Sequence, residues 1–345
     1  MLNVLAVILV FGGIVLIHEF GHFLFAKLNG IGVVEFAIGM GPTLLSIKKG
    51  ETKYSIKLFP IGGFCMMVGE DQNDQSENSF QTKSVWARIS VVIAGPLFNF
   101  LLAFVLAMVI VANVGYDSAQ LVGVTEGFSA AEQGMQAGDT LTKINGHSIK
   151  IYRDVTMYLY FHPQDELEVE YLRDGETHTA HLVPKYSEDT GSYRIGIVVS
   201  GQRVPTKNFL EVMQYGAYEV RFWITNVVQS LGYALRGQVS SDEIGGPVRI
   251  VGMIGSTVEQ TKDYGMAVLL LNLANISVLL SANLGVMNLL PIPALDGGRL
   301  LFMLVEAVRG KPISAEKEGM VHLAGFAILM VLMVFLLFND IRNIF

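Results

Sequence analysis

The sequence contains a single cysteine, Cys65, among its 345 residues. One thiol excludes an internal disulfide framework and any zinc site built from several cysteines. Charged residues are also scarce, at 16% of the chain, whereas soluble proteins carry about a quarter. The net charge is −7 and no basic cluster stands out, so the composition gives no support for a nucleic-acid partner.

Hydrophobic residues make up 51% of the chain and gather in four long runs. Each run approaches the roughly 20 residues that a helix needs to cross the hydrocarbon of a lipid bilayer. The first run lacks the basic start and the cleavage site of a secretory signal peptide, so we expect it to be retained. The sequence predicts a polytopic α-helical membrane protein with about four spans: Leu2–Leu28, Val91–Asn113, Ala267–Pro293 and Met320–Phe338.

Lysine and arginine are unevenly distributed between these runs. Seven lie in residues 26–90 and four in the loop 299–318, against none in the first three residues and one after residue 338. Because basic residues favour cytoplasmic loops, we expect both of these segments in the cytoplasm and both termini outside. The long stretch 114–263 then lies outside the cell.

The first run contains His18-Glu19-Phe-Gly-His22, three polar side chains in apolar sequence. On a helix, His18 and His22 project from one face and can share a metal ion, while Glu19 lies close enough to reach a metal-bound water. Polar side chains inside a span are uncommon and usually functional. The motif predicts one Zn²⁺ per chain, with Glu19 as general base and the histidines as ligands. A chance match is the alternative.

A catalytic zinc takes three protein ligands, and no third histidine follows at the spacing of metzincin proteases. The third run ends in Asn288-Leu-Leu-Pro291-Ile-Pro293-Ala-Leu-Asp296-Gly-Gly. Its prolines break the helix and its glycines allow a sharp turn, which presents Asp296 on the same side as the histidines. We expect Asp296 to be the third ligand. An aspartate that caps a short helix is the alternative.

Together these motifs resemble the site-2 protease family of intramembrane zinc metalloproteases, in particular the bacterial regulator-of-sigma-E protease type. Ala94-Gly-Pro-Leu-Phe-Asn99 and Gly245-Gly-Pro-Val248 match further motifs of that family. The resemblance implies a multi-pass protein of a bacterial cytoplasmic membrane. Its implied substrates are single-span membrane proteins, such as a trimmed anti-sigma factor or a leftover signal peptide.

Residues 115–200 predict one inserted, extracytoplasmic PDZ-like α+β domain. A short helix from Ser129 is followed by strands at Thr140–Gly146, Leu167–Tyr171 and Thr177–Leu182. The stretch Gly134-Met-Gln-Ala-Gly-Asp139 and the strand after it are similar to PDZ domains of bacterial envelope proteases. Such domains bind peptide ends by strand addition, so a peptide ligand is expected, and a domain that only filters substrates by size is the alternative.

Two other segments have regular patterns. Residues 31–68 alternate and turn at Lys49-Gly-Glu51, which predicts a small cytoplasmic β-hairpin region, and the family resemblance implies that this region is membrane-associated. It either braces the first helix or holds a substrate by β-addition. Residues 208–236 have helical amphipathic spacing, and we expect them on the membrane surface or packed against the PDZ-like domain. The predicted parts of the chain are 1–114, 115–200, a linker region 201–262, and 263–345.

Amide and proline side chains near the expected zinc site are candidates for substrate binding: Asn99, Asn288, Pro291 and Pro293. An amide can hold an extended backbone or stabilise an oxyanion, although hydrogen bonding between helices is the alternative. A membrane PDZ receptor or chaperone with a structural zinc is a rival function, but it needs no Glu19. A metal transporter is a second rival, yet the second run has no titratable residue and the fourth has only His322.

Overall fold

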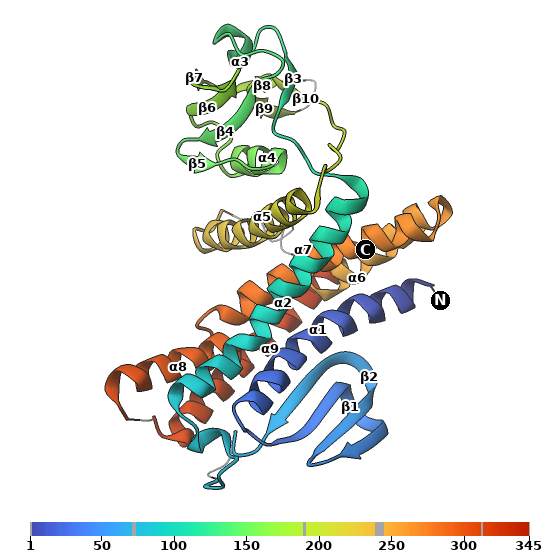
Figure 1. Ribbon diagram of the computed structural model, residues 1–345, viewed down its shortest axis with the longest axis vertical. Helices are drawn as coiled ribbons and strands as arrows, with labels where there is room; N and C mark the ends of the chain where they lie inside the picture. Colours follow the sequence, from blue (N-terminus) through green and yellow to red (C-terminus); the bar gives the residue numbers. More distant parts are fainter. Residues whose placement is uncertain (1, 71–73, 189–190, 239–244, 312, 345) are drawn as a thin grey trace. The chain divides into compact units, whose positions relative to one another are not determined.

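The computed structural model describes residues 2–70, 74–188, 191–238, 245–311 and 313–344. The chain divides into two compact units, which Figure 1 colours along the sequence. Unit 1 combines residues 1–106 with residues 230–345, and unit 2 is the intervening stretch 107–229. Unit 2 therefore contains all of residues 115–200, the range predicted for the inserted domain, together with residues on either side.

Four helices in the described residues are long and apolar enough to cross a membrane, which confirms the prediction of a polytopic membrane protein. The second begins at Val85, ahead of the predicted Val91, because Arg88 is paired with Glu306 and does not end the helix. The four helices are α1 (Leu2–Leu28), α2 (Val85–Val114), α7 (Met266–Leu289) and α9 (Ala315–Ile344).

A further helix, α8 (Asp296–Arg309), corrects the prediction of a loop over residues 299–318. Met303 is buried on its inner face, so this segment has a packing surface and does not remain a loop. The helix ends at Gly310, whose φ of 67° is the left-handed conformation common after a helix C-terminus. Unit 1 also contains two short 3₁₀ turns, η1 (Phe80–Thr82) and η2 (Lys262–Tyr264).

The helix α6 (Pro247–Thr261) packs against α1 and α7 and starts at the predicted Gly245-Gly-Pro-Val248 motif. Its first backbone N–H groups are capped by a buried carboxylate from α9. The N–H of Gly246 donates to Oδ1 of Asp340 at 2.8 Å, and that of Arg249 donates to Oδ2 at 3.1 Å. A Cβ at position 246 would lie 2.6 Å from Oδ2, so this close approach requires glycine.

Two apolar clusters hold unit 1 together. One joins the first half of α1 to α6 and α7, and the other joins the end of α1 to the β-strands, the start of α2, and α8. The first cluster contains Ala6, Val10, Ile14, Ile254, Val258, Leu269, Leu273 and Ile276. The second contains Ala26, Ile31, Val33, Phe36, Cys65, Met67, Phe80, Ile89, Val91, Val92 and Met303.

The predicted β-region consists of two long antiparallel strands, β1 (Val33–Lys49) and β2 (Thr52–Met67), which meet at the predicted turn. Both strands bend, so the first part of β1 is paired with β2 on both sides. Ala37, for example, pairs with Ser55 on one side and with Phe64 on the other. Among the described residues, the stretch 63–67 pairs only with β1. No other described strand is hydrogen-bonded to its outer edge. The exposed apolar side chains of the two strands include Met40, Leu44, Leu45, Ile47, Ile56, Leu58 and Phe59.

Unit 2 contains a four-stranded antiparallel sheet, two additional strand pairs and two short helices. The sheet order is β5-β4-β6-β7, and the additional pairs are β10-β3 and β8-β9. Asp174 and Gly175 both have positive φ, as the tight hairpin turn between β6 and β7 requires. The elements are β3 (Leu121–Val124), α3 (Ser129–Glu132), β4 (Thr140–Ile144), β5 (His147–Ser148), α4 (Tyr152–Phe161), β6 (Leu167–Arg173), β7 (Glu176–Leu182), β8 (Lys185–Ser187), β9 (Ser192–Arg194) and β10 (Ile197–Val199).

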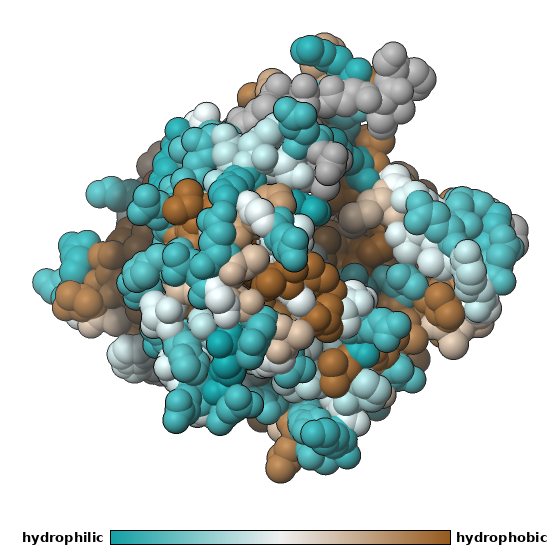
Figure 2. Space-filling view, turned by 90° about the horizontal axis from the view of Figure 1, so that it is seen from above, coloured by the Kyte–Doolittle hydropathy of each residue, from teal (hydrophilic) through white to brown (hydrophobic). Residues whose placement is uncertain are grey.

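The strands and α4 enclose one apolar core, which includes Leu121, Leu141, Ile144, Val169 and Leu182. Figure 2 shows one face of the molecule, on which hydrophilic residues predominate. Asp139 is fully buried beside this core. Burial raises its pKa, but hydrogen bonds and charge from Arg173 outweigh that effect and hold the pKa below its ordinary value.

The amphipathic segment forms α5 (Phe209–Leu235), which packs on α4 through Phe222. Two ion pairs of opposite polarity join these helices. Arg153 of α4 is paired with the buried Glu219 of α5, and Arg221 of α5 lies 2.6 Å from the buried Asp154 of α4. The structure thus divides residues 201–262 between the two units, since α5 packs on the inserted domain while α6 belongs to the helices of unit 1.

Candidate metal centre

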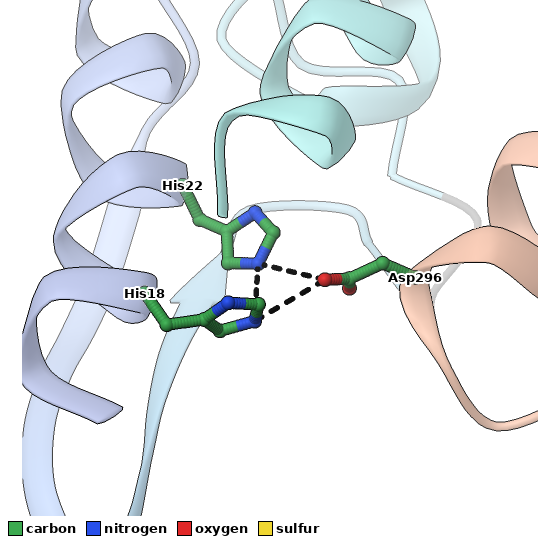
Figure 3. A group of neighbouring side chains, drawn as sticks. All are labelled: His18, His22 and Asp296. Atoms are coloured by element: carbon green, nitrogen blue, oxygen red, sulfur yellow. Dashed lines mark hydrogen bonds and ion pairs between the residues drawn. The ribbon is translucent and has the colours of Figure 1, made fainter. Parts of the chain in front are cut away.

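The predicted ligands His18, His22 and Asp296 converge in unit 1 (Figure 3). Both histidines are buried on the same face of α1, and Asp296 is the first residue of α8. Nε2 of His18 lies 3.2 Å from Oδ2 of Asp296 and 3.2 Å from Nε2 of His22. Nε2 of His22 lies 3.4 Å from the same Oδ2. Three atoms able to bind a metal therefore meet at one point.

These distances suit a zinc ion. Ligand atoms about 2.0–2.1 Å from a tetrahedral zinc lie roughly 3.3 Å from one another, close to the three separations between His18, His22 and Asp296. Two imidazole nitrogens with one carboxylate oxygen are also a donor set of catalytic zinc sites, which leave a fourth position for water or substrate. Within the described part of the chain, this is the only group of three or more such side chains.

The two histidines are oriented by α2. Nδ1 of His22 lies 2.9 Å from the backbone oxygen of Val91, so this nitrogen carries the proton and Nε2 keeps its lone pair for a metal. Nδ1 of His18 lies 3.1 Å from the amide group of Asn99. When Nε2 of His18 binds a metal, Nδ1 of the same ring carries the proton and donates a hydrogen bond. The Asn99 side chain accepts this hydrogen bond through its amide oxygen, once the amide group has rotated so that the oxygen faces the ring. Both ring orientations thus depend on one segment of α2.

Close packing of α1 against α2 explains the glycine in Ala94-Gly95-Pro96. A Cβ at Gly95 would collide with Nε2 of His22 and with the ring of His18. A Cβ at Gly21, between the histidines on α1, would collide with the backbone oxygen of Ala94. Any larger residue at either position would push the helices apart. The two glycines therefore set the distance between the histidines and the segment that orients them.

The predicted helix interruption positions Asp296. The helix α7 ends at Leu289, and two turns follow in which the N–H of Ile292 donates to Leu290 and that of Leu295 donates to Ile292. A Cβ at Gly297 would collide with the backbone oxygen of Leu290, so α8 begins directly against the end of α7. The prolines end one helix and the glycines allow the next to start beside it.

Glu19 follows His18 on α1, and its carboxylate is near enough to His18, His22 and Asp296 to interact electrostatically with each. The strand β2 passes close by: a Cβ built on Gly63 would lie 3.3 Å from Cγ of Glu19. Gly63, the first residue of the stretch 63–67, therefore lies against the predicted base. No pattern in the sequence indicated this contact.

The predicted substrate-binding residues lie in two different environments. Asn99 is fully buried, and its amide faces His18. Asn288 lies in the last turn of α7, with Pro291 and Pro293 in the following connection, and all three retain solvent exposure. Sequence reasoning missed the Val91 carbonyl and Gly95, although a glycine followed by a proline inside an apolar helix is a recognisable signal of close packing.

The sequence matches peptidase family M50 over residues 6–332. It is 34% identical to the zinc metalloprotease RasP of Bacillus licheniformis, with 99% of each chain covered. It is 33% identical to the regulator of sigma-W protease RasP of Bacillus subtilis, again with 99% of each chain covered. These alignments run over 426 and 427 positions, so both relatives contain residues that this shorter chain lacks.

Among solved structures, the PDZ domain of the SdrC-like protein from Listeria innocua is similar to part of this chain. It is 25% identical, covers 25% of this chain and 98% of its own, and has a TM-score of 0.23. The corresponding domain from Listeria monocytogenes is 23% identical, with coverage of 25% and 90% and the same TM-score of 0.23.

Proposed function

The chain belongs to peptidase family M50 and is a membrane zinc metalloprotease, and we propose that His18, His22 and Asp296 hold its catalytic zinc. The single observation that supports this assignment best is the convergence of these three side chains beside Glu19. The protein cleaves peptide bonds within transmembrane segments. Single-span membrane proteins are the proposed substrates, including a trimmed anti-sigma factor, as the family resemblance implies. The Bacillus subtilis relative is named a regulator of sigma-W protease.

In the proposed mechanism, Glu19 is the general base. Zinc supplies Lewis acidity at the scissile carbonyl and lowers the pKa of water. Glu19 takes a proton from the attacking water and gives it to the nitrogen of the departing amine, so its carboxylate is restored at the end of the cycle. The Val91 carbonyl and Asn99 hold the histidine rings in place during this transfer. Asn288 is placed to bind the substrate backbone or the oxyanion.

The strand edge at residues 63–67 is the proposed substrate clamp. A helical substrate hides its amides within its own hydrogen bonds, so it must be held extended before hydrolysis. Strand addition supplies that hold through backbone hydrogen bonds. Among the described residues, no second strand is hydrogen-bonded to this edge, and Gly63 lies against Glu19. A substrate paired there would therefore be delivered next to the base.

We place α5 on the outer membrane surface. Within unit 2, a Cβ at Gly216 would lie 2.9 Å from Cγ of Met108, so α5 crosses α2 near the end of a membrane span. One side of α5 carries exposed Leu210, Val228 and Leu235. An apolar face at that level is suited to the boundary between headgroups and acyl chains. The PDZ-like domain then lies outside the cell, where it binds a peptide end or restricts access by size.

Metal removal tests the enzymatic function. A chelator such as 1,10-phenanthroline should lower cleavage of a single-span peptide by at least about 10³-fold, because the metal contributes several kcal/mol of transition-state stabilisation. Adding Zn²⁺ back should restore the rate, measured by mass spectrometry of the fragments. A protein that binds zinc stoichiometrically and never cleaves such a peptide would instead match a receptor with a structural metal.

Thiol labelling tests the proposed orientation. The positions Ser76 and Ser192 are exposed, whereas Cys65 is buried and burial raises the pKa of its thiol, which keeps it unreactive. In intact cells, Ser192→Cys should react almost completely with an impermeant maleimide. Ser76→Cys should stay at the wild-type background until the cells are lysed. The reverse pattern would place the PDZ-like domain in the cytoplasm.

A further inference from the structure

His322 is the only titratable side chain that the sequence places within the fourth apolar run, and the proposed mechanism gives it no task. It lies on α9, with 17% of its side chain exposed. Its Nδ1 accepts a hydrogen bond from the backbone N–H of Ala294 at 2.8 Å. Ala294 belongs to the connection between α7 and α8, two residues before Asp296. The fourth span therefore contacts the segment that presents the third ligand.

Ala294 has an unusual backbone conformation. Its φ is 78°, and it is one of only three non-glycine residues with positive φ in the described chain. A side chain with a Cβ is disfavoured in this left-handed region, so the surrounding structure must hold it there. The other two, Asn145 and Asp174, belong to residue types that tolerate this conformation, but alanine does not share that tolerance. The hydrogen bond to His322 directly opposes relaxation of this residue.

A second contact lies one helical turn further along α9. A Cβ at Gly325 would collide with Cβ of Pro293 and with its backbone oxygen, so α9 touches this connection with no intervening side chain. The ring of Phe302, on α8, lies with its centroid 5.7 Å from that of His322. The connection is thus confined by His322 and Gly325 on one side and by α8 on the other.

We propose that His322 is a positioning residue for the metal centre, because it holds Ala294 in the left-handed conformation that directs Asp296 toward the histidines. The inference rests on the proposed role of Asp296 as a ligand. His322 does not touch the metal or the reacting atoms. It acts through the backbone of Ala294. The fourth span, α9, therefore helps to hold Asp296 in position, although the two histidines belong to α1.

Zinc affinity in the purified full-length protein tests this role. His322→Leu removes the acceptor but suits the membrane environment, and it should weaken zinc binding about tenfold in chelator competition, as losses of outer partners of metal ligands typically do. His322→Asn places an amide oxygen near the position of Nδ1 and should recover most of that loss. Glycine adopts positive φ freely, so Ala294→Gly added to His322→Leu should also recover it.

The control is Val331→Ala, at an exposed position further along α9, which should leave zinc affinity unchanged. The proposal would be overturned by a folded His322→Leu variant with wild-type zinc affinity. It would equally be overturned if zinc binding were restored neither by His322→Asn nor by the added Ala294→Gly. An error in the proposed zinc site would give a different result. If Asp296 were not a ligand, Asp296→Ala would keep wild-type zinc affinity.

Discussion

Glu19→Gln should lower peptide hydrolysis by at least about 10³-fold while zinc content stays at the wild-type level. The amide has nearly the same shape as the carboxylate, so the packing of α1 against β2 at Gly63 is preserved. It cannot take a proton from water, however, and cannot return one to the leaving amine. The measurement pairs metal analysis of purified protein in detergent with cleavage of a transmembrane peptide.

Glu51→Gln is the matched control, because Glu51 lies at the exposed turn between β1 and β2 and should leave both readings unchanged. If Glu19→Gln lost zinc and activity in parallel, Glu19 would be a ligand. If it retained substantial activity, another group would be the base. Zinc retained with activity abolished also separates an enzyme from a receptor with a structural metal, since a structural site requires no base.

Asp296→Ala should lower both zinc affinity and the hydrolysis rate, each by at least about 100-fold, because two imidazoles remain where a catalytic zinc takes three protein ligands. Asp296→Asn should have nearly the same effect, since a neutral amide oxygen is a poorer zinc ligand than a carboxylate. Asp296→Glu keeps the charge but extends it by one methylene. It should therefore retain more zinc than the alanine variant while losing rate through displacement of the metal.

The corresponding control is Asp263→Ala, in the exposed turn η2. Zinc is measured by mass spectrometry after dialysis against a graded chelator series, and the rate is measured with the same transmembrane peptide. Full zinc and full activity in Asp296→Ala would remove this residue from the centre and leave the third ligand to be found elsewhere. Loss of activity with wild-type zinc affinity would make Asp296 a substrate contact.

The local features were those that the sequence predicted well. Four apolar runs, the turn after Lys49 and the strands of the inserted domain follow from hydrophobic pattern and turn residues, which act over short distances. The convergence of His18 and His22 with Asp296 was also predicted, because metal chemistry demands a third ligand and few carboxylates lie near membrane depth. Their roles remain predictions that the proposed variants test.

Contacts between distant segments could not be read from the pattern. Nothing in the sequence indicates that β2 pairs with both sides of β1, or that Gly63 lies beside Glu19. The sequence predicts a loop over residues 299–318, whose four basic residues indicate the cytoplasmic side, whereas the structure forms α8 there with Met303 on its buried side. The contact of Asn99 with His18 depends on how closely α1 and α2 approach, which no local pattern indicates.

The opposite polarity of the two ion pairs between α4 and α5 fixes their alignment. Each helix contributes one arginine and one carboxylate, so a shift of α5 along or around α4 would separate both pairs at once. Both carboxylates are buried, so breaking either pair would strand a charge away from water. We therefore expect α5 to follow the inserted domain as one body whenever that domain moves.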